Sequence, residues 1–366
     1  RCMSNAAGGE GPATPTVGCE PRRCLDKRCS DDRAKGRARR ARRHPGRADR
    51  PADDLRRYTH PMLDARSVAA AAYGCAVWPA LLSGEIRPAG VTSRGLFLHA
   101  GRRGTVFLTT EPFRGPRTVN LDGDMPWPDG RIPEAGWALD AERRSLRAEA
   151  GGIHLPAQAE WRAALPRVRP DPNGASDRLR ALVMNLIPVS TADESIAVLA
   201  GVLGMREAPS AGPAALGSHV PRLLRELRLG FPVRSTRALT AILGRGRGLT
   251  PTGDDVVVGA LLAGCRWRAA PLAGASGGPM GALVRAARER TTRLSACLIE
   301  CAMQGEADER LLALADHLWT GAPPAQAALA AALGWGASSG VDALLGMALV
   351  LLADGSGSPA HLPGGG

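Results

Sequence analysis

The sequence of 366 residues contains no long uninterrupted apolar run and no recognisable secretion signal. Its longest apolar stretch, residues 341–353, includes Asp342 and is far shorter than the ~20 residues that a membrane-spanning helix needs. The first residues lack the apolar core of a signal peptide, and the eight cysteines form no paired framework. We therefore expect a cytoplasmic protein without a transmembrane helix.

Two common catalytic motifs are absent as well. The sequence has neither the Gly-x-Ser-x-Gly elbow of many hydrolases nor the His-Glu-x-x-His motif of zinc enzymes. The histidines at positions 99, 154, 219 and 317 are scattered and form no arrangement typical of a nucleophile or a metal site. Hydrolase triads and zinc chemistry are disfavoured, and we identify no metal ligands.

The positive charge is concentrated at the N-terminus. Residues 1–60 hold 16 of the 47 Lys and Arg and 8 of the 35 Asp and Glu, which is two thirds of the net charge of +12. This segment has almost no apolar residues, so we expect it to be disordered. It is either an arm that binds RNA or another polyanion, or a passenger segment. No aromatic residue before Tyr58 could stack on a base, which favours the passenger segment.

The composition changes along the rest of the chain. An alanine-rich run over residues 63–77 predicts a helix that Pro79 ends. Short runs typical of strands follow at residues 91–99, 105–110, 117–121 and 145–155. Beyond residue 177, Ala and Leu recur at helical spacing. The expected helices are 177–187, 192–204, 213–229, 234–243, 253–265, 280–304, 307–319, 323–333 and 340–353.

These patterns predict an α+β fold, in which a small, mainly antiparallel N-terminal β region precedes a larger all-helical domain. The expected segments are a disordered Arg-rich tail over 1–61, a helix plus β-rich region over 62–165, a linker over 166–176, the helical domain over 177–353 and a flexible tail over 354–366.

The most informative run covers residues 244–255, Gly-Arg-Gly-Arg-Gly-Leu-Thr-Pro-Thr-Gly-Asp-Asp. Glycines at alternate positions allow positive φ angles, and the loop leads into a helix whose free N–H groups would attract an anion. Arg245 and Arg247 would add positive charge. Thr252 and Asp255 fit a simple capping box. The alternative is that one of the adjacent carboxylates, Asp254 or Asp255, binds a metal ion or transfers a proton, because a cap needs only one of them.

A second segment repeats this plan 87 positions later. Ser339, Gly340, Asp342 and Gly346 correspond to Thr252, Gly253, Asp255 and Gly259. We hypothesise that the two helix N-termini meet at one polar pocket; the alternative is a chance recurrence of capping residues. Between them, the hydroxyls of Thr291, Thr292 and Ser295 bind either a ligand oxygen or carbonyls of their own helix.

Three motifs together resemble a bacterial domain-of-unknown-function family: the run at 244–255, Thr-Thr-x-x-Ser at 291–295 and Ser-Ser-Gly-x-Asp at 338–342. This family includes AllH, a subunit linked to oxamate carbamoyltransferase in allantoin degradation. The resemblance covers roughly residues 63–353 and is strongest over 244–346. It implies exchange of a carbamoyl group between an oxamate-type acid and phosphate within a multi-subunit enzyme. Arg247 departs from the family, where a proline or small residue is expected.

We therefore predict a carbamoyltransferase, or a subunit of one, that binds a small carboxylate such as oxamate and phosphate or carbamoyl phosphate at glycine-rich helix N-termini. The alternative is a non-catalytic anion-binding or scaffolding subunit. The expected partners are companion subunits and the small anionic substrate, without nucleic acid or membrane. No cofactor is identified, and Mg²⁺ is a candidate at Asp254 or Asp255. The predicted catalytic residues are Asp254, Asp255 and Asp342. The predicted ligand-binding residues are Arg245, Gly246, Gly248, Thr250, Thr252, Gly253, Thr292, Ser295, Ser338, Ser339 and Gly340.

Overall fold

The computed structural model describes residues 66–354, except 103, 124–135, 149–150, 165–169, 172, 190–192, 207–214, 232–233 and 268–277. The predictions for the tail over 1–61, for part of the linker over 166–176 and for the tail after residue 354 lie outside the described residues.

The β region forms a mixed sheet with the strand order β2-β3-β4-β5-β1-β8-β7-β6, and β9 pairs with β1. Among the described strands, five of the eight pairings are antiparallel. In β3 the side chains alternate between buried and half-buried, as expected for a strand with one face on a core. The elements are β1 Arg66–Gly74, α1 Val77–Leu81, β2 Ile86–Thr92, β3 Gly95–Ala100, β4 Gly104–Thr109, β5 Thr118–Leu121, β6 Ala138–Asp140, β7 Ser145–Ala148, β8 Gly151–His154 and β9 Glu160–Trp161.

The helix expected over residues 63–77 is wrong, because most of that run is strand β1. This strand pairs antiparallel with β5 on one side and parallel with β8 on the other. Two ladders of backbone hydrogen bonds override the helix propensity of the alanines. The expected stop at Pro79 is also wrong, since Pro79 lies within the first turn of α1, where its missing N–H costs no hydrogen bond.

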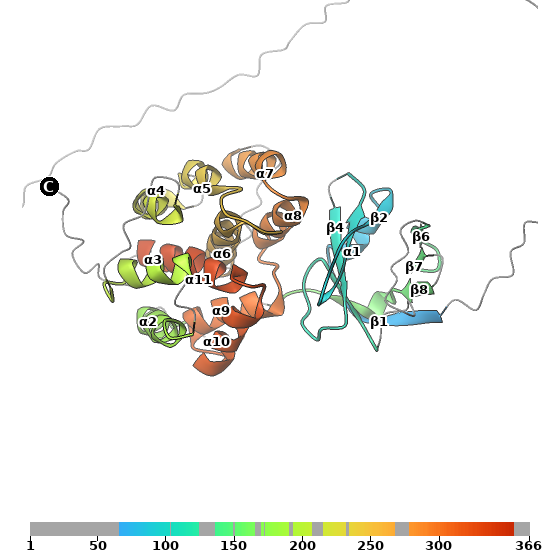
Figure 1. Cartoon of the computed structure of the whole chain (residues 1–366), viewed down its shortest axis with the longest axis horizontal. Coiled ribbons are helices and arrows are strands. Elements are labelled where there is room, and N and C mark those ends of the chain that lie inside the picture. The colour runs from blue at the N-terminus through green and yellow to red at the C-terminus, as the bar shows by residue number, and fades with distance from the viewer. Residues whose placement is uncertain are drawn as a thin grey trace, which may run out of the picture. The chain divides into compact units, whose positions relative to one another are not determined.

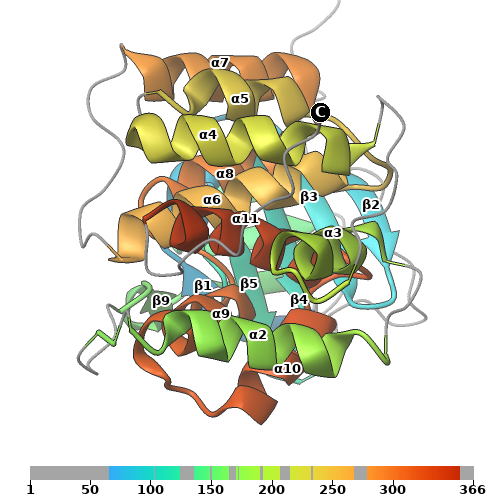
Figure 2. The same cartoon turned by 90° about the vertical axis from the view of Figure 1, so that its left-hand side faces the viewer.

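The helical region has three layers, which are visible in two views (Figures 1 and 2). Helices α4, α5 and α7 form one outer layer, and α2, α9 and α10 form the other. Between them, α6 and α11 pack against each other and are buried along almost their whole lengths. The helices are α2 Ala175–Leu186, α3 Glu194–Val202, α4 Val220–Gly230, α5 Thr236–Ile242, α6 Thr252–Trp267, α7 Pro279–Arg290, α8 Arg293–Ala302, α9 Glu309–Thr320, α10 Ala325–Gly334 and α11 Ser339–Ala353.

The single helix expected over residues 280–304 is wrong, because the chain breaks between α7 and α8. Thr291 and Thr292 both have extended backbone angles. The Thr292 side chain caps α8 by accepting a hydrogen bond from the N–H of Ser295 at 3.1 Å. A threonine that caps a helix start competes with helix continuation, and this break places both threonines beside the glycine-rich loop.

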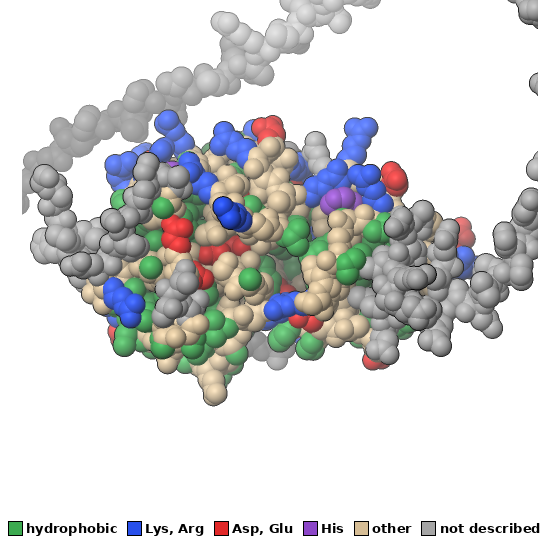
Figure 3. All heavy atoms as spheres, in the orientation of Figure 1, with side chains coloured by type: hydrophobic (Ala, Val, Ile, Leu, Met, Phe, Trp, Pro, Cys, Tyr) green, Lys and Arg blue, Asp and Glu red, His purple; other side chains and the backbone are tan. Residues whose placement is uncertain are grey.

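The α+β class, with strands first and helices after, is confirmed. The buried apolar residues form two separate clusters, one in the β region and one in the helical region. The described β and helical regions belong to one compact unit, and the domain boundaries expected from the sequence stay a prediction. None of the described helices combines the length and the apolar character of a membrane span. Arg side chains gather on the side of the molecule that carries α4, α5 and α7 (Figure 3).

Candidate functional site

The glycine-rich loop before α6 adopts the backbone that its glycines predict. Gly244, Gly246 and Gly248 have φ angles of +72°, +106° and +102°. At Gly246 a Cβ atom would lie 2.7 Å from the backbone nitrogen of Thr252, so both conformation and space require glycine. The loop therefore folds tightly over the start of α6.

The starts of α6 and α11 lie together. The hydroxyls of Thr250 and Ser339 are within hydrogen-bond distance of each other, at 3.0 Å. Their correspondence extends to the backbone: the N–H groups of Asp254 and Asp255 donate to the Pro251 carbonyl, and those of Val341 and Asp342 donate to the Ser338 carbonyl. The two helices thus begin in the same way, and their first turns meet.

Three N–H groups at the start of α6 are already bonded. The amides of Asp254 and Asp255 are bonded within their own turn, and the amide of Gly253 donates to the Arg245 carbonyl at 2.8 Å. Anion binding at this helix start stays a prediction, and the side chains around the loop are further groups that would contribute to it.

A cavity of about 530 Å³ is lined by both loops and by the β region. The loops contribute residues 247–250 and 335–339, and the β region contributes residues 92–94 and 115–118. Four predicted ligand-binding residues line it: Gly248, Thr250, Ser338 and Ser339. The remaining predicted site residues lie outside the lining: Arg245, Gly246, Thr252, Gly253, Thr292, Ser295, Gly340, Asp254, Asp255 and Asp342.

The cavity is lined by four arginines, but Arg245 is not one of them. The Nε of Arg245 donates back to the Ala241 carbonyl of α5 at 3.0 Å, whereas the exposed Arg247 lines the cavity. Arg94, Arg117 and Arg310 also line it. No local sequence pattern marks these three, because they come from a strand turn, a strand entry and a distant helix.

Asp254 holds the glycine-rich loop against the break between α7 and α8. Its carboxylate accepts hydrogen bonds from the Gly244 N–H at 2.8 Å and from the Thr291 hydroxyl. Burial raises the pKa of this carboxyl, and these two donors partly offset the rise. Thr292 fixes the same loop, since its hydroxyl donates to the Leu249 carbonyl at 2.7 Å.

The Asp255 carboxylate is buried and makes no well-formed hydrogen bond with the described residues. It is 0% exposed, and neither of its oxygens has a hydrogen-bond partner of good geometry among the described residues. Burial raises its pKa well above the usual range; the nearby hydroxyls of Ser339 and Thr250 lower it, and the charge of Asp342 raises it further. The carboxyl group therefore lies directly behind the two hydroxyls that meet at 3.0 Å.

Asp342 is the equivalent carboxylate on α11. It accepts hydrogen bonds from the hydroxyls of Ser195 and, at 3.1 Å, Ser338. Burial raises its pKa to about 6, and the hydroxyl of Thr252 is among the groups that lower it. Each helix therefore places its aspartate near the first hydroxyl of the other helix: Asp342 near Thr252, and Asp255 near Ser339.

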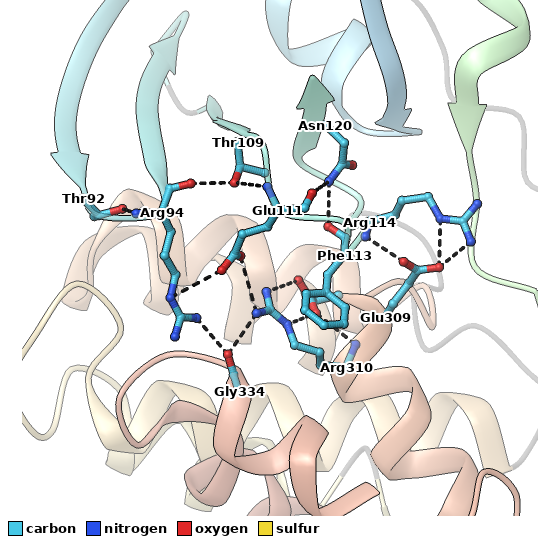
Figure 4. Close-up of polar contacts among 11 residues, drawn as sticks. Thr92, Arg94, Thr109, Glu111, Phe113, Arg114, Asn120, Glu309, Arg310 and Gly334 are labelled. Carbon is cyan, nitrogen blue, oxygen red and sulfur yellow. Dashed lines mark hydrogen bonds and ion pairs between the residues drawn. The ribbon is translucent and has the colours of Figure 1, made fainter. Parts of the chain in front are cut away.

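An ion-pair network joins the β region to α9 at the edge of the cavity (Figure 4). Arg310 binds both oxygens of Asp308, at 2.8 and 2.9 Å. Arg310 and Arg94 both donate to the Gly334 carbonyl, at 2.9 and 2.8 Å. The Glu111 carboxylate lies 3.5 Å from each guanidinium. This network fixes the turn before β3 over the loop that precedes α11.

The described residues contain no group of three or more His, Cys, Asp or Glu side chains that could hold a metal ion. The role of Mg²⁺ at Asp254 or Asp255 stays a prediction.

The fold and the site together define a class of α+β protein. In this class the loops before two similar helix N-termini line a cavity, and buried carboxylates lie behind them. Residues 242–351 match the model of the family described as oxamate carbamoyltransferase subunit AllH. This segment runs from the end of α5 into α11 and includes both helix starts. The resemblance predicted from the motifs is confirmed over this segment. No curated protein and no solved structure matches the chain.

Proposed function

We propose that this chain is a carbamoyltransferase, or a subunit of one, that transfers a carbamoyl group between phosphate and a small carboxylate such as oxamate. The matched family is described as a subunit of oxamate carbamoyltransferase, and the matched segment contains both loops that line the cavity. We place the substrates in this cavity.

The observation that carries the proposal is the pairing of hydroxyls and arginines around the cavity. Thr250, Ser338 and Ser339 present hydroxyls from the two loops, and Arg247 and Arg94 flank them. Guanidinium groups bind carboxylates and phosphates with two parallel hydrogen bonds, and hydroxyls bind amide and carbonyl groups. The cavity volume of about 530 Å³ is adequate for carbamoyl phosphate and oxamate together.

In this reaction the oxamate nitrogen attacks the carbamoyl carbon. A C–N bond forms, the bond from the carbamoyl carbon to the phosphate oxygen breaks, and phosphate leaves with that electron pair and accepts the proton lost from nitrogen. The exposed Arg247 would bind an anionic group of the substrates, and the hydroxyls of Thr250 and Ser339 would orient the carbonyl oxygen as negative charge develops. Asp255 would act as a positioning residue that orients these two hydroxyls.

The test is phosphate release from carbamoyl phosphate with oxamate present, for the chain alone and together with the other subunits of an oxamate carbamoyltransferase. We expect Arg247→Gln to raise KM without changing the thermal midpoint. Arg245→Gln is the matched control, because Arg245 lies in the same loop outside the cavity lining, and it should leave KM unchanged. Equal effects of the two substitutions would contradict the placement of substrate in this cavity.

One observation favours the alternative, a non-catalytic anion-binding or scaffolding subunit: none of the three aspartates lines the cavity. Carbamoyl phosphate binding that depends on Arg247, with no turnover even when the companion subunits are present, would establish that alternative in place of the transferase.

A further inference from the structure

A second cavity lies in the helical region, next to the start of the first glycine-rich loop, and its lining is strongly basic. Residues 220–242 and 279–290, which form α4, α5 and α7, contain eight arginines and two glutamates. Arg side chains gather on this side of the molecule (Figure 3). This excess of one charge is local, because the described chain elsewhere pairs Arg178, Arg266 and Arg310 with carboxylates.

The cavity has a volume of about 540 Å³ and is lined by four arginines from separate elements. Arg222 comes from α4, Arg234 from the connection to α5, Arg237 from α5 and Arg290 from the end of α7. The rest of the lining consists of two threonines and two alanines. The packing of three helices therefore brings the Arg290 guanidinium to those of Arg222, Arg234 and Arg237.

No carboxylate balances these charges. None of the lining residues is acidic, and among the described residues the four arginines make no ion pair. The Arg290 guanidinium donates only to a backbone carbonyl, that of Thr240, at 3.3 Å. Four like charges around one cavity repel one another unless an anion lies between them, so a bound anion would relieve this repulsion.

The lining also indicates what kind of anion fits. The volume exceeds what one phosphate group needs, and the lining holds no aromatic or large apolar side chain that could pack on a nucleobase. Arginine binds phosphate through two parallel hydrogen bonds, and two threonine hydroxyls add further donors. We propose that the cavity between α4, α5 and α7 binds a compact oligophosphate anion, such as pyrophosphate or a triphosphate group. The lining of this site shares no residue with that of the proposed transferase cavity.

The test is calorimetric titration of the full chain with pyrophosphate and with tripolyphosphate at near-physiological salt. The site variant combines Arg234→Gln with Arg237→Gln, both exposed residues of the lining. The control combines Arg225→Gln with Arg228→Gln, which are exposed on α4 but do not line the cavity. All three proteins carry the same basic residues 1–60. Each variant has lost two positive charges relative to the wild type, so a difference between the two variants reports the cavity alone.

We expect saturable binding that the site variant weakens at least about tenfold and the control less than about twofold, since each lost bidentate contact removes a strong charge-assisted hydrogen bond. Equal weakening in both variants, or no saturable binding, would overturn the proposal. ATP that binds as tightly as tripolyphosphate would support recognition through the phosphates. An acidic peptide such as oligoglutamate that depends on the site, while the oligophosphates do not, would assign the cavity to a protein partner and overturn the proposal.

Discussion

Gly259 of α6 lies against the backbone of Ala343 of α11, so closely that a Cβ atom at Gly259 would be 1.9 Å from the Ala343 carbonyl oxygen. The reverse contact has the same form: a Cβ at Gly346 would be 2.0 Å from the Val256 carbonyl oxygen. The two contacts are equivalent, because Gly346 corresponds to Gly259 and Ala343 to Val256 at the spacing of 87 residues. The two central helices therefore cross through equivalent residues, which brings their first turns together and the loops before them to the same cavity.

This crossing predicts that Gly259→Ala destabilises the protein. The added methyl group has no space between the two backbones, and overpacking of this kind typically costs about 1–3 kcal/mol. Urea unfolding of the variant should show a lower midpoint. Gly90→Ala is the control, because a Cβ at Gly90 meets no atom within 4 Å. Equal stability of Gly259→Ala and the wild type would contradict the close crossing.

The adjacent aspartates at the start of α6 should respond differently to substitution. Asp254→Ala leaves the Gly244 N–H and the Thr291 hydroxyl without an acceptor, which should lower the free energy of unfolding by about 1–3 kcal/mol. Asp255→Asn loses no well-formed hydrogen bond and removes a carboxyl group whose ionisation burial disfavours, so the thermal midpoint should stay unchanged or rise. The same substitution should abolish carbamoyl transfer. A large loss of stability with activity retained would instead assign Asp255 to helix capping.

Asp342 should make stability depend on pH. Burial raises its pKa to about 6, whereas an unfolded aspartate titrates near about 3.9. The folded state therefore holds a proton that the unfolded chain has released, and this contribution is complete below about pH 4 and lost as the pH rises through about 6. A difference of two units corresponds to about 3 kcal/mol.

Denaturant unfolding from pH 4 to pH 7 would measure this contribution. Asp342→Asn should flatten the decline in stability, whereas Asp177→Asn, which removes an exposed carboxylate on α2, should leave it in place. Identical pH profiles for Asp342→Asn and the wild type would refute the assignment.

Arg310 should contribute strongly to stability because it neutralises the buried Asp308. Breaking a buried pair by removing one partner typically costs about 3–5 kcal/mol, so Arg310→Ala should lower the unfolding midpoint markedly. The control is Arg143→Ala, whose pair with Asp140 is exposed at 3.8 Å and should contribute under about 1 kcal/mol.

Arg94 and Arg310 should also be coupled. Both donate to the Gly334 carbonyl and both lie 3.5 Å from Glu111, so a double-mutant cycle to alanine should depart from additivity by about 0.5 kcal/mol or more. Strict additivity would show that the two arginines act separately.

Local signals account for what the sequence could predict of the site. Positive φ at Gly244, Gly246 and Gly248 follows from glycine alone, and the matching starts of α6 and α11 follow from Thr252 and Ser339 with their glycines and aspartates. Which of Arg245 and Arg247 lines the cavity could not be predicted, for a physical reason. Neighbouring side chains of an irregular loop point in different directions, and only the folded backbone decides which one reaches the cavity.

Contacts between distant segments account for what the sequence could not predict. Arg94 and Arg310 lie more than two hundred positions apart, and no local pattern connects them before the β region packs on α9. Strand β1 is a similar case. Its alanines favour a helix in isolation, and two neighbouring strands reverse that preference.

The floor and the rim of the first cavity come from different parts of the chain. The floor lies in residues 247–250 and 335–339, inside the matched family segment, whereas the turn at residues 92–94 and the strand entry at 115–118 lie outside it. If the cavity binds the substrates as we propose, substitutions in the turn at 92–94 or the strand entry at 115–118 would change which compound is accepted without altering the matched segment.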